Sequence, residues 1–546
     1  MECYKTPMPK TLTLFFLLIF ATSHSVVGKD DGLSAAQFSE KLKNERDQFL
    51  NSETNKKDYL RLLELERQAL QISEDQPLKL GSIGSAILDI YPWSQTGHYA
   101  MSIFYAHLDS VEAKQLHENS LRRIQHSMTK DLTGESDQPF PILTINDAKT
   151  FAKTSGYSPV GSIYRTTENI SLGALVLARK EKSPLKYWFY DLSKTLVALE
   201  PKSNNNESPG WPLIRELANA SDSAAQVAIG AYLVNQRKFN SAISWLSVSS
   251  RSGNLLANSL LGRTYWSQSR LANTDKIKKE KLELAQENYL HAIALGSTQS
   301  MYTLAGLYLQ GHYGQNNEQA ALALLQQAAS LDHVESILYI GQLHNSGKGS
   351  IEQDIAKANQ YFLQAAALED ESAAIMYGRF LISRRELSLE YGDITKWLKN
   401  HANNDSAEAM IILGNLYATG TTVPASINAA IRWYKRAVKQ DIQNSNIVNE
   451  VAWTLTVSNI QGLKRPKYAK KIMDRLMESS DRARNQPEYL DTWAATHAAS
   501  GDFDQAKILQ KEAISVASKE RTDVIGILRE HLELFRNGRT VTEKAP

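Results

Sequence analysis

The sequence contains almost no cysteine. Its one cysteine, Cys3, lies ahead of the first apolar run, so a chain processed after that run would carry no thiol. Disulfide bonds therefore contribute nothing to the predicted fold of the remaining chain. Thiolate catalysis and metal–thiolate binding are excluded for the same reason.

An excess of charge of one sign is also missing. The 546 residues contain 61 Lys and Arg against 59 Asp and Glu, which gives a formal net charge of +2. A nucleic-acid-binding surface usually appears as a basic excess or stripe, so we expect no nucleic-acid partner. We interpret the short basic runs at 276–281 and 464–471 as exposed helix faces and loops.

The sequence has no familiar catalytic motif. It lacks a Gly-x-Ser-x-Gly elbow, a Walker loop, a dinucleotide-binding glycine pattern and a His-Glu-x-x-His motif. Four histidines recur at nine or ten residues, but this spacing would not bring them together on one helix. We interpret them as structural or exposed and predict no catalytic, cofactor-binding or metal-binding residue. The histidines and the acidic residues among them are His98, His107, His117, His126, Asp109, Glu112 and Glu118.

The apolar run near the N-terminus is too short to span a bilayer. It extends from Leu14 to Phe20, between two lysines and a stretch of small residues, whereas a membrane span needs about 20 residues. The pattern predicts a secretory signal peptide, residues 1–28, cleaved after Ser23 or Gly28. An uncleaved anchor, which would have to thin the membrane around it, is the alternative. We expect an exported protein, periplasmic or secreted, that is not inserted in a membrane after cleavage.

Residues 29–202 are predicted to form a separate α+β domain, because they carry no internal repeat. Helical spacing of apolar residues gives way to short runs of β-branched and aromatic residues, which predict a small antiparallel sheet. We expect Asp109 or Ser110 to cap the fourth helix and Asn146 to cap a short helix over 147–154. The predicted helices are 35–50, 58–72, 98–106 and 110–128, and the predicted strands are 141–145, 160–166, 171–179 and 186–191.

Pro92, Trp93, Gly97 and His98 indicate a tight turn into a helix. Free backbone amides at such a helix start can hold a phosphate or a carboxylate. A turn packed by Trp93 is the interpretation that we prefer.

The middle of the chain contains an internal repeat. A small residue recurs six times together with a second mark, and the later units follow one another at steps of 36 or 37 residues. A period of this size predicts stacked helix pairs, because one unit cannot bury its apolar face alone. We expect a polar linker at 203–214 and a solenoid over 215–441. The first marks are Gly230, Gly262, Ala305, Gly341, Gly378 and Gly414, and the second are Ala242, Ala285, Ala321, Ala358, Ile394 and Ala430.

Positions counted from the second mark predict how the units pack. The third and fourth are large or aromatic in nearly every unit, as in Trp433 and Tyr434, and the seventh is usually small, which lets the facing helix approach. His401 replaces the small residue in the fifth unit, so that unit should pack less tightly or turn its histidine to solvent. The eleventh position is expected to end the helix or to form the next turn. It is occupied by Gly253, Gly296, Asp332, Glu369, Asp405 and Asp441.

Two segments of the last unit carry a family pattern. They are Leu413-Gly-Asn-Leu-Tyr-Ala-Thr-Gly420 and Ala430-Ile-Arg-Trp-Tyr-Lys-Arg-Ala437. Together they resemble a Sel1-like repeat, a relative of the tetratricopeptide repeat. The resemblance implies a mostly α fold, in which a right-handed α-solenoid of helix pairs follows the small α+β domain. Residues 442–546 are similar to tetratricopeptide units, with an amphipathic helix over 522–535 that covers the open end.

The resemblance also implies protein–protein recognition. Such proteins typically act as adaptors or assembly scaffolds, and exported bacterial ones often work in the cell envelope. We expect a non-enzymatic scaffold that binds other proteins or peptides in a concave groove lined by first helices. The alternative is that the 29–202 domain is an enzyme or binds a small ligand, while the solenoid recruits its substrate. A β-lactam-hydrolysing role, claimed for cysteine-rich relatives, is disfavoured because those depend on disulfides.

Overall fold

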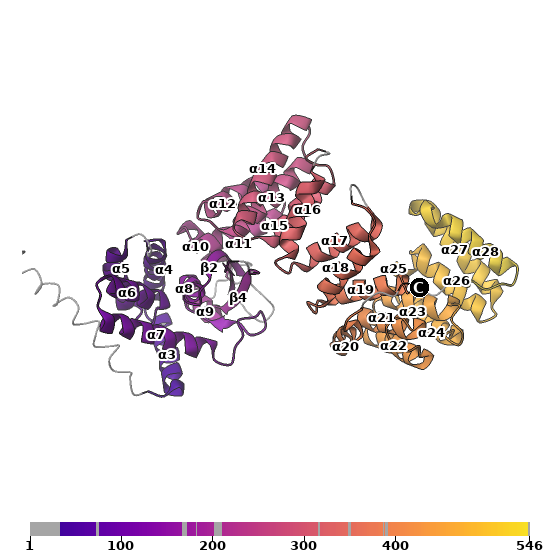
Figure 1. Ribbon diagram of the computed structural model, residues 1–546, viewed down its shortest axis with the longest axis horizontal. Coiled ribbons are helices and arrows are strands. Elements are labelled where there is room, and N and C mark those ends of the chain that lie inside the picture. Colours follow the sequence, from indigo (N-terminus) through magenta and orange to yellow (C-terminus); the bar gives the residue numbers. More distant parts are fainter. Residues whose placement is uncertain are drawn as a thin grey trace, which may run out of the picture. The chain divides into compact units, whose positions relative to one another are not determined.

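A computed structural model describes residues 33–72, 76–165, 172–181, 183–200, 210–314, 317–347, 351–385, 387 and 391–543. The predicted signal peptide and residues 203–209 of the predicted linker lie outside these ranges. Contacts divide the chain into two compact units, residues 1–317 and 318–546, and each is described by itself (Figure 1). In the described ranges, no helix combines the length and the apolar character that a membrane crossing requires.

The first unit begins with helices whose apolar faces form a common core. The helix predicted over 35–50 is confirmed, and Ser34 and Gln37 close a capping box at its start. A helix over Leu80–Ile90 was not predicted. Its Gly81 lets the ring of Phe104 approach closely, since a Cβ atom there would lie 2.7 Å from Phe104 Cε2. The elements are α3 (Ala35–Leu50), α4 (Asn55–Ile72), η1 (Pro77–Lys79), α5 (Leu80–Ile90), α6 (Gln95–His107) and α7 (Val111–Thr129).

A four-stranded sheet follows, and it is mixed. The strand order is β1-β4-β3-β2; β3 is antiparallel to both neighbours, whereas β1 is parallel to β4. The predicted small sheet is confirmed, and its antiparallel pairing holds for β2, β3 and β4, whereas β1 pairs with β4 in parallel. Helix α8 and the β2–β3 hairpin lie between β1 and β4 in the chain, and this long connection returns β4 in the direction of β1. The elements are β1 (Phe140–Pro141), α8 (Ile145–Thr154), β2 (Ser158–Arg165), β3 (Gly173–Arg179), β4 (Lys186–Asp191) and α9 (Ser193–Leu199).

Two predicted helix caps differ in the structure. Thr144 caps α8, where its hydroxyl accepts the backbone N–H of Asp147 at 3.2 Å. Asn146, which was predicted to cap this helix, lies in its first turn and donates to the carbonyl of Leu63 at 3.0 Å. Ser110 does stand at the start of α7, but its side chain makes no capping hydrogen bond.

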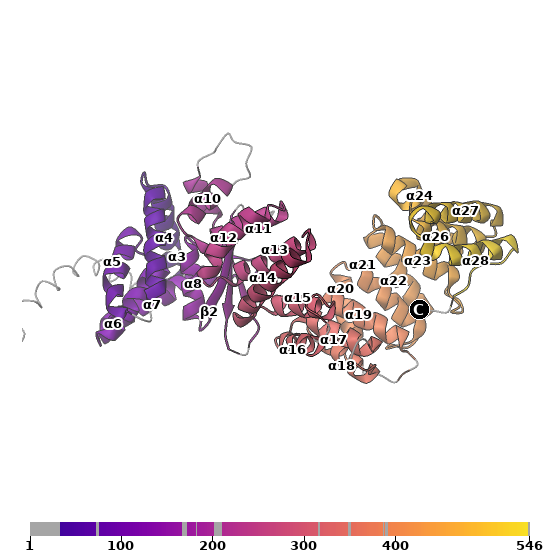
Figure 2. The same cartoon turned by 90° about the horizontal axis from the view of Figure 1, so that it is seen from above.

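The repeat helices of the first unit pack directly against the sheet (Figure 2). Tyr164 of β2 donates to Asp222 Oδ2 at 3.4 Å, and Asn254 Nδ2 donates to the carbonyl of Ser162 at 2.9 Å. Asp222 and Asn254 also cap the helices that follow them. The division between a domain over 29–202 and a solenoid from 215 stays a prediction. These contacts join residues from both of these regions. The helices are α10 (Trp211–Asn219), α11 (Ser223–Asn235), α12 (Phe239–Arg251), α13 (Leu255–Arg270), α14 (Asp275–Ala294) and α15 (Thr298–Leu309).

The second unit consists of helix pairs and a closing helix. In several pairs the first helix is capped by a polar side chain, as by Asp370, Ser406 and Asn444. Its last helix buries Leu528 and Phe535, close to the expected amphipathic segment 522–535. The helices are α16 (Glu318–Ala329), α17 (Val334–Ser346), α18 (Ile355–Ala366), α19 (Glu371–Ser383), α20 (Ile394–Asn403), α21 (Ala407–Thr419), α22 (Ile427–Gln440), α23 (Ser445–Val457), α24 (Pro466–Ser479), α25 (Asp481–Arg484), α26 (Pro487–Ala499), α27 (Phe503–Glu520), η2 (Thr522–Val524) and α28 (Ile525–Arg536).

In four of the repeats, the small mark of the first helix lies against the large fourth-position residue of the second helix. A Cβ atom built on Gly262 would lie 2.7 Å from Tyr289 Cδ1, and one on Gly341 would lie 2.9 Å from Phe362 Cε1. In both pairs the glycine of the first helix faces the large fourth-position residue of the second helix. The small mark therefore recurs because a ring or a leucine occupies the space that its side chain would need.

The eleventh position forms the turn between units. Five of its six residues adopt a left-handed backbone, which glycine tolerates best and which Asp adopts more readily than most residues. Asp441, with φ of −133°, is the exception. The left-handed residues, with φ between 57° and 99°, are Gly253, Gly296, Asp332, Glu369 and Asp405.

Candidate functional site

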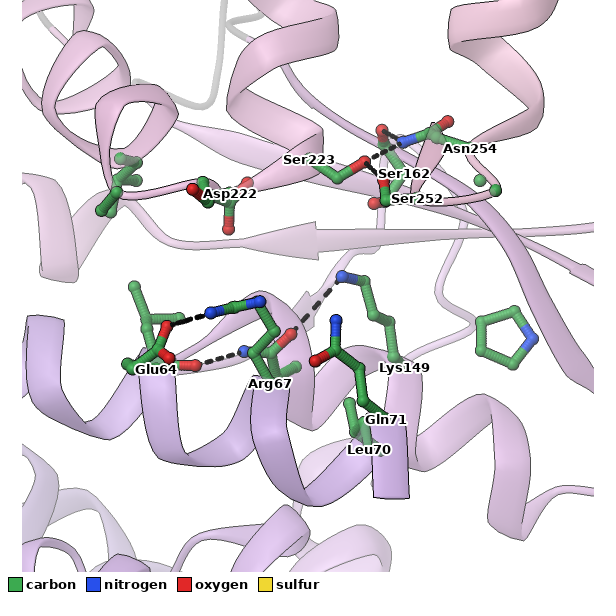
Figure 3. Close-up of a pocket in the computed structure, with 18 of the residues that line it drawn as sticks. Glu64, Arg67, Leu70, Gln71, Lys149, Ser162, Asp222, Ser223, Ser252 and Asn254 are labelled. Atoms are coloured by element: carbon green, nitrogen blue, oxygen red, sulfur yellow. Dashed lines mark hydrogen bonds and ion pairs between the residues drawn. The ribbon is translucent and has the colours of Figure 1, made fainter. Parts of the chain in front are cut away.

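A cavity of about 550 Å³ lies in the first unit, where the front helices meet the first repeat helices. Helices α4 and α8 form one wall, β2 contributes its start, and the turns before α11 and α13 form the opposite wall (Figure 3). This volume is in the range of small-molecule sites. The lining residues come from five separate segments of the chain, so no local sequence motif could have predicted the cavity.

The wall formed by α4 and α8 carries positive charge. Arg67 donates to Glu64 Oε2 from Nη2 at 2.5 Å and from Nε at 3.1 Å, so these two charges are paired. Lys149 Nζ makes a long hydrogen bond of 3.4 Å to the neutral amide of Asn146. Burial lowers the pKa of Lys149, and the charge of Asp222 across the cavity partly opposes this effect. Lys153, one helical turn further along α8, is also part of the lining.

The opposite wall is fixed by two capped turns. Asp222 Oδ1 accepts the N–H of Ala225 at 2.9 Å, and Asn254 Oδ1 accepts the N–H of Leu256 at 3.1 Å. Burial raises the pKa of Asp222, whereas the charge of Lys149 and hydrogen bonds from the backbone of Ala225 and Ala224 lower it. Ser223 shares the wall and binds Asn254 Nδ2 through its hydroxyl at 3.0 Å. The wall is thus shaped before any ligand binds.

A pair of buried carboxyl groups holds α4, α6 and α8 together. Glu66 accepts hydrogen bonds of 2.7 Å from both Ser94 Oγ and Thr144 Oγ1. Asp147 Oδ1 accepts the N–H of Thr96 at 2.9 Å. Burial, followed by the nearby charge of Asp147, raises the pKa of Glu66 well above its usual range. Burial likewise raises the pKa of Asp147, whereas the hydrogen bonds from Thr96 and Ser94 lower it.

Two of the four histidines come together, and two do not. His98 on α6 and His117 on α7 are both buried, with 3.0 Å between their Nδ1 atoms. His98 Nε2 must donate to the carbonyl of Pro92 at 3.0 Å, so its Nδ1 accepts a hydrogen from His117. Burial lowers the pKa of His98 to about 4, which keeps it neutral. His107 and His126 are exposed.

The pairing arises because the histidines stand on different helices. Their spacing in the sequence predicts only whether residues of one helix share a face. The acidic residues among them do not join the pair: Asp109 and Glu112 are exposed, and Glu118 binds Lys114 at 3.5 Å. In the described ranges, no three His, Cys, Asp or Glu side chains are grouped so that they could hold a metal ion.

The predicted turn at Pro92 and Trp93 leads into α6, which starts at Gln95 rather than at His98. Ser94 caps the helix by accepting the N–H of Gly97 at 3.1 Å. The N–H of Thr96 is bonded to Asp147. These amides, which could have held an anion, therefore serve the fold, and Trp93 packs edge-on against Phe38.

In the second unit, the face formed by the first helices carries a charged cluster. Arg379 of α19 and Glu450 of α23 approach to 3.8 Å, although α21 lies between their helices in the repeat order. Side chains two repeats apart can meet only where the stack curves toward them, so this face is the concave one. Burial raises the pKa of Glu450, Arg379 lowers it, and the charge of Glu408 on α21 raises it again. We call Arg379, Glu408 and Glu450 the concave cluster.

The fifth unit departs from the others at His401. This half-buried histidine, together with Trp397 and Glu369, lines a hollow of about 400 Å³. Ile394, Leu398 and Ala402 of α20 are nonetheless fully buried, so the looser packing expected for this unit stays a prediction.

Three of the repeats match a known family model. Residues 298–333, 334–370 and 407–442 match the family model described as Sel1 repeat. Chitin synthase regulator SKT5 of Saccharomyces cerevisiae is 29% identical over 140 residues, which are 25% of this chain. The chain spans 20% of the length of that curated relative.

Two solved structures are among those found similar to this chain. A Sel1 repeat protein from Oxalobacter formigenes is 20% identical, with 46% of this chain and 100% of that chain covered and a TM-score of 0.33. The protective antigen c5321 of uropathogenic Escherichia coli, described as an SLR fold, is 12% identical, with 91% and 97% covered and a TM-score of 0.34. The family match and the helix-pair packing lead to one conclusion. This chain carries Sel1 repeats in an α-solenoid, which follows a small domain of helices and a mixed sheet in the sequence.

Proposed function

We propose that this protein is an exported, non-enzymatic scaffold that binds other proteins or peptides along the concave face of its Sel1 repeats, in the bacterial cell envelope. The concave cluster carries the proposal, because three successive first helices bring Arg379, Glu408 and Glu450 to one surface. Stacked helix pairs offer an extended surface of this kind rather than a reaction centre.

The sequence supports the export part of the proposal. A short apolar run after two lysines and before small residues is typical of a signal peptide. The envelope location is proposed because the chain resembles a family whose exported bacterial members often work there. The yeast relative is named a regulator of an enzyme, and we take from it only the general role of binding another protein.

A second candidate function is favoured by the cavity in the first unit. A small-ligand site there would make residues 29–202 a ligand-binding or enzymatic module, with the repeats as a recruiting arm. Deletion of residues 29–202 cannot separate the two functions, because it would remove β2 from the faces of α11 and α13. Point variants on the concave face are the better test.

Affinity capture from the native envelope fraction at raised salt tests the scaffold function. The bait is the chain without residues 1–28, compared with an Arg379→Glu variant and with Lys439→Glu as the control. Lys439 is exposed on α22, a second helix, so its reversal changes the charge equally without touching the concave cluster. Partners that are retained by the wild type and the control but lost by Arg379→Glu support the proposal. Equal retention by all three baits contradicts it.

A further inference from the structure

The charge of the cavity in the first unit selects the charge of a ligand. Arg67, Lys149 and Lys153 are the positive residues of its lining, and Glu64 and Asp222 are the negative ones, which leaves an excess of one positive charge. A ligand with one negative charge would neutralise this excess. A phosphate dianion would instead leave the half-enclosed space with a net negative charge.

Lys149 is the cation that is available to such an anion. The charge of Arg67 is paired with Glu64, and Asp222 is bonded to the first amides of α11 and to Tyr164. In the part of the chain that the structure describes, no carboxylate lies within 4.0 Å of Lys149 Nζ, whose hydrogen bond goes to the neutral Asn146. A half-buried ammonium group has three hydrogens to donate, so a ligand carboxylate would supply partners that the fold does not.

The rest of the lining selects the body of the ligand. Leu60, Leu63 and Leu70 on α4 line the cavity together with Val160 and Leu217. The described lining contains no aromatic ring on which a nucleobase or a sugar could stack. The apolar part of the ligand is therefore aliphatic, and about 550 Å³ accommodates a few residues of a peptide or a small acid.

We propose that this cavity binds a carboxylate attached to a short aliphatic chain. The carboxylate pairs with Lys149, and the aliphatic chain packs against the leucines of α4. The C-terminal residue of a peptide and a small aliphatic acid share this chemistry. The site lies in the first unit and does not depend on the concave cluster of the second.

Isothermal titration calorimetry of the chain without residues 1–28 tests the site. The probes are acetyl-Gly-Val-Leu with a free carboxylate, the same peptide as its C-terminal amide, and hexanoate. We expect a free carboxylate to bind and the amide to bind at least tenfold more weakly. Lys149→Gln should weaken the carboxylate at least tenfold, whereas Lys57→Gln, an exposed residue of α4, should leave it unchanged.

The outcomes separate the two sources of the carboxylate. Hexanoate binding as tightly as the peptide acid identifies a small acid, and tighter binding of the peptide identifies a peptide terminus. The comparison of acid with amide uses the wild-type chain, so it does not depend on how well Lys149→Gln folds. Equal binding of acid and amide, no binding of any probe, or wild-type affinity in a folded Lys149→Gln variant overturns the proposal.

Discussion

Gly414 lies directly against the ring of Tyr434, and a Cβ atom at Gly414 would stand 2.5 Å from Tyr434 Cε1. The ring has no simple retreat, because it is buried and its hydroxyl donates to Asn415 Oδ1 at 2.7 Å. The contact joins α21 to α22 within one Sel1 repeat, between its small mark and the fourth-position residue. It shows why the repeat needs its small residue.

Replacing this glycine tests the packing of the repeat. We expect Gly414→Ala to lower the free energy of unfolding by roughly 1–3 kcal/mol, the usual cost of overpacking a core. Gly306→Ala is the matched control, since a Cβ atom there would meet no atom of the described chain within 4 Å. In that open helical position alanine should raise stability by up to about 1 kcal/mol. Urea unfolding measures both, and a neutral Gly414→Ala variant would contradict the account of the small mark.

The buried pair of His531 and Asp491 predicts a pH dependence of stability. Burial lowers the pKa of His531, but the hydrogen bond to Asp491 at 2.9 Å and the charges of Asp491, Glu543 and Glu530 outweigh it and raise the pKa. The stabilising contribution is therefore complete below the unfolded histidine pKa of about 6.5 and is lost as pH rises through the higher folded value.

Substitution of His531 isolates this contribution. At pH 6, His531→Gln should lower the free energy of unfolding by roughly 1.5–3 kcal/mol, the range for a hydrogen bond to a charged group. The difference from the wild type should shrink as pH rises to 9. Exposed His126→Gln serves as the control and should track the wild type. A difference that is constant with pH would show that the histidine acts without its charge.

Glu66 predicts a loss of stability with rising pH, the reverse of the trend for a carboxyl group whose pKa is lowered by a salt bridge. Because its pKa is raised in the folded chain, its contribution is complete below the unfolded value of about 4.3 and is lost as pH rises toward the folded value. Glu66→Gln remains neutral, so its stability relative to the wild type should increase between pH 5 and 9, by about 1.4 kcal/mol for each unit by which the folded pKa is raised.

Glu64 supplies a neighbour for comparison on the same helix. Burial raises its pKa, but hydrogen bonds from Arg67 and Gln68 outweigh this and lower it. Glu64→Gln should therefore lose stability relative to the wild type as pH rises through about 4, by a small amount because the pair is partly exposed. Parallel pH trends in the two variants would refute the distinction between them.

The turn between repeats offers a test of backbone strain. Glu369 adopts φ of 59°, and relief of the left-handed conformation should make Glu369→Gly more stable by about 1 kcal/mol. Asp441 occupies the equivalent position with φ of −133°, so Asp441→Gly should lower stability by up to about 1 kcal/mol through chain entropy. Thermal unfolding of both variants decides this, and changes of equal sign would count against the turn argument.

The repeat region could be predicted because its physics is periodic. The contact of Gly262 with Tyr289 has the same cause as that of Gly414 with Tyr434, so each unit repeats the same residue choices in the sequence. The turns at Asp332 and Asp405 could be predicted for the same reason. Asp441 is the exception among the six, because α22 continues to Gln440 and Asp441 directly follows its last residue.

The front of the chain could be predicted only in part, because its strand pairing, its cavity and its histidine pair depend on contacts between residues far apart in the sequence. The helix over Ala35–Leu50 was predicted from local spacing and capping. The parallel pairing of Phe140 with Tyr190 depends on the path of the chain between them, and the cavity depends on Lys149 and Asp222, which lie far apart in sequence. Likewise, His98 and His117 meet only because α6 and α7 pack together.

The central claim is that the concave face of the Sel1 repeats binds a partner protein, and a titration of a captured partner tests it most directly. We predict that Arg379→Glu raises the Kd at least tenfold, equivalent to about 1.4 kcal/mol, whereas Lys439→Glu stays within twofold of the wild type. An unchanged Kd for Arg379→Glu, with both variants folded as the wild type is, would contradict the claim.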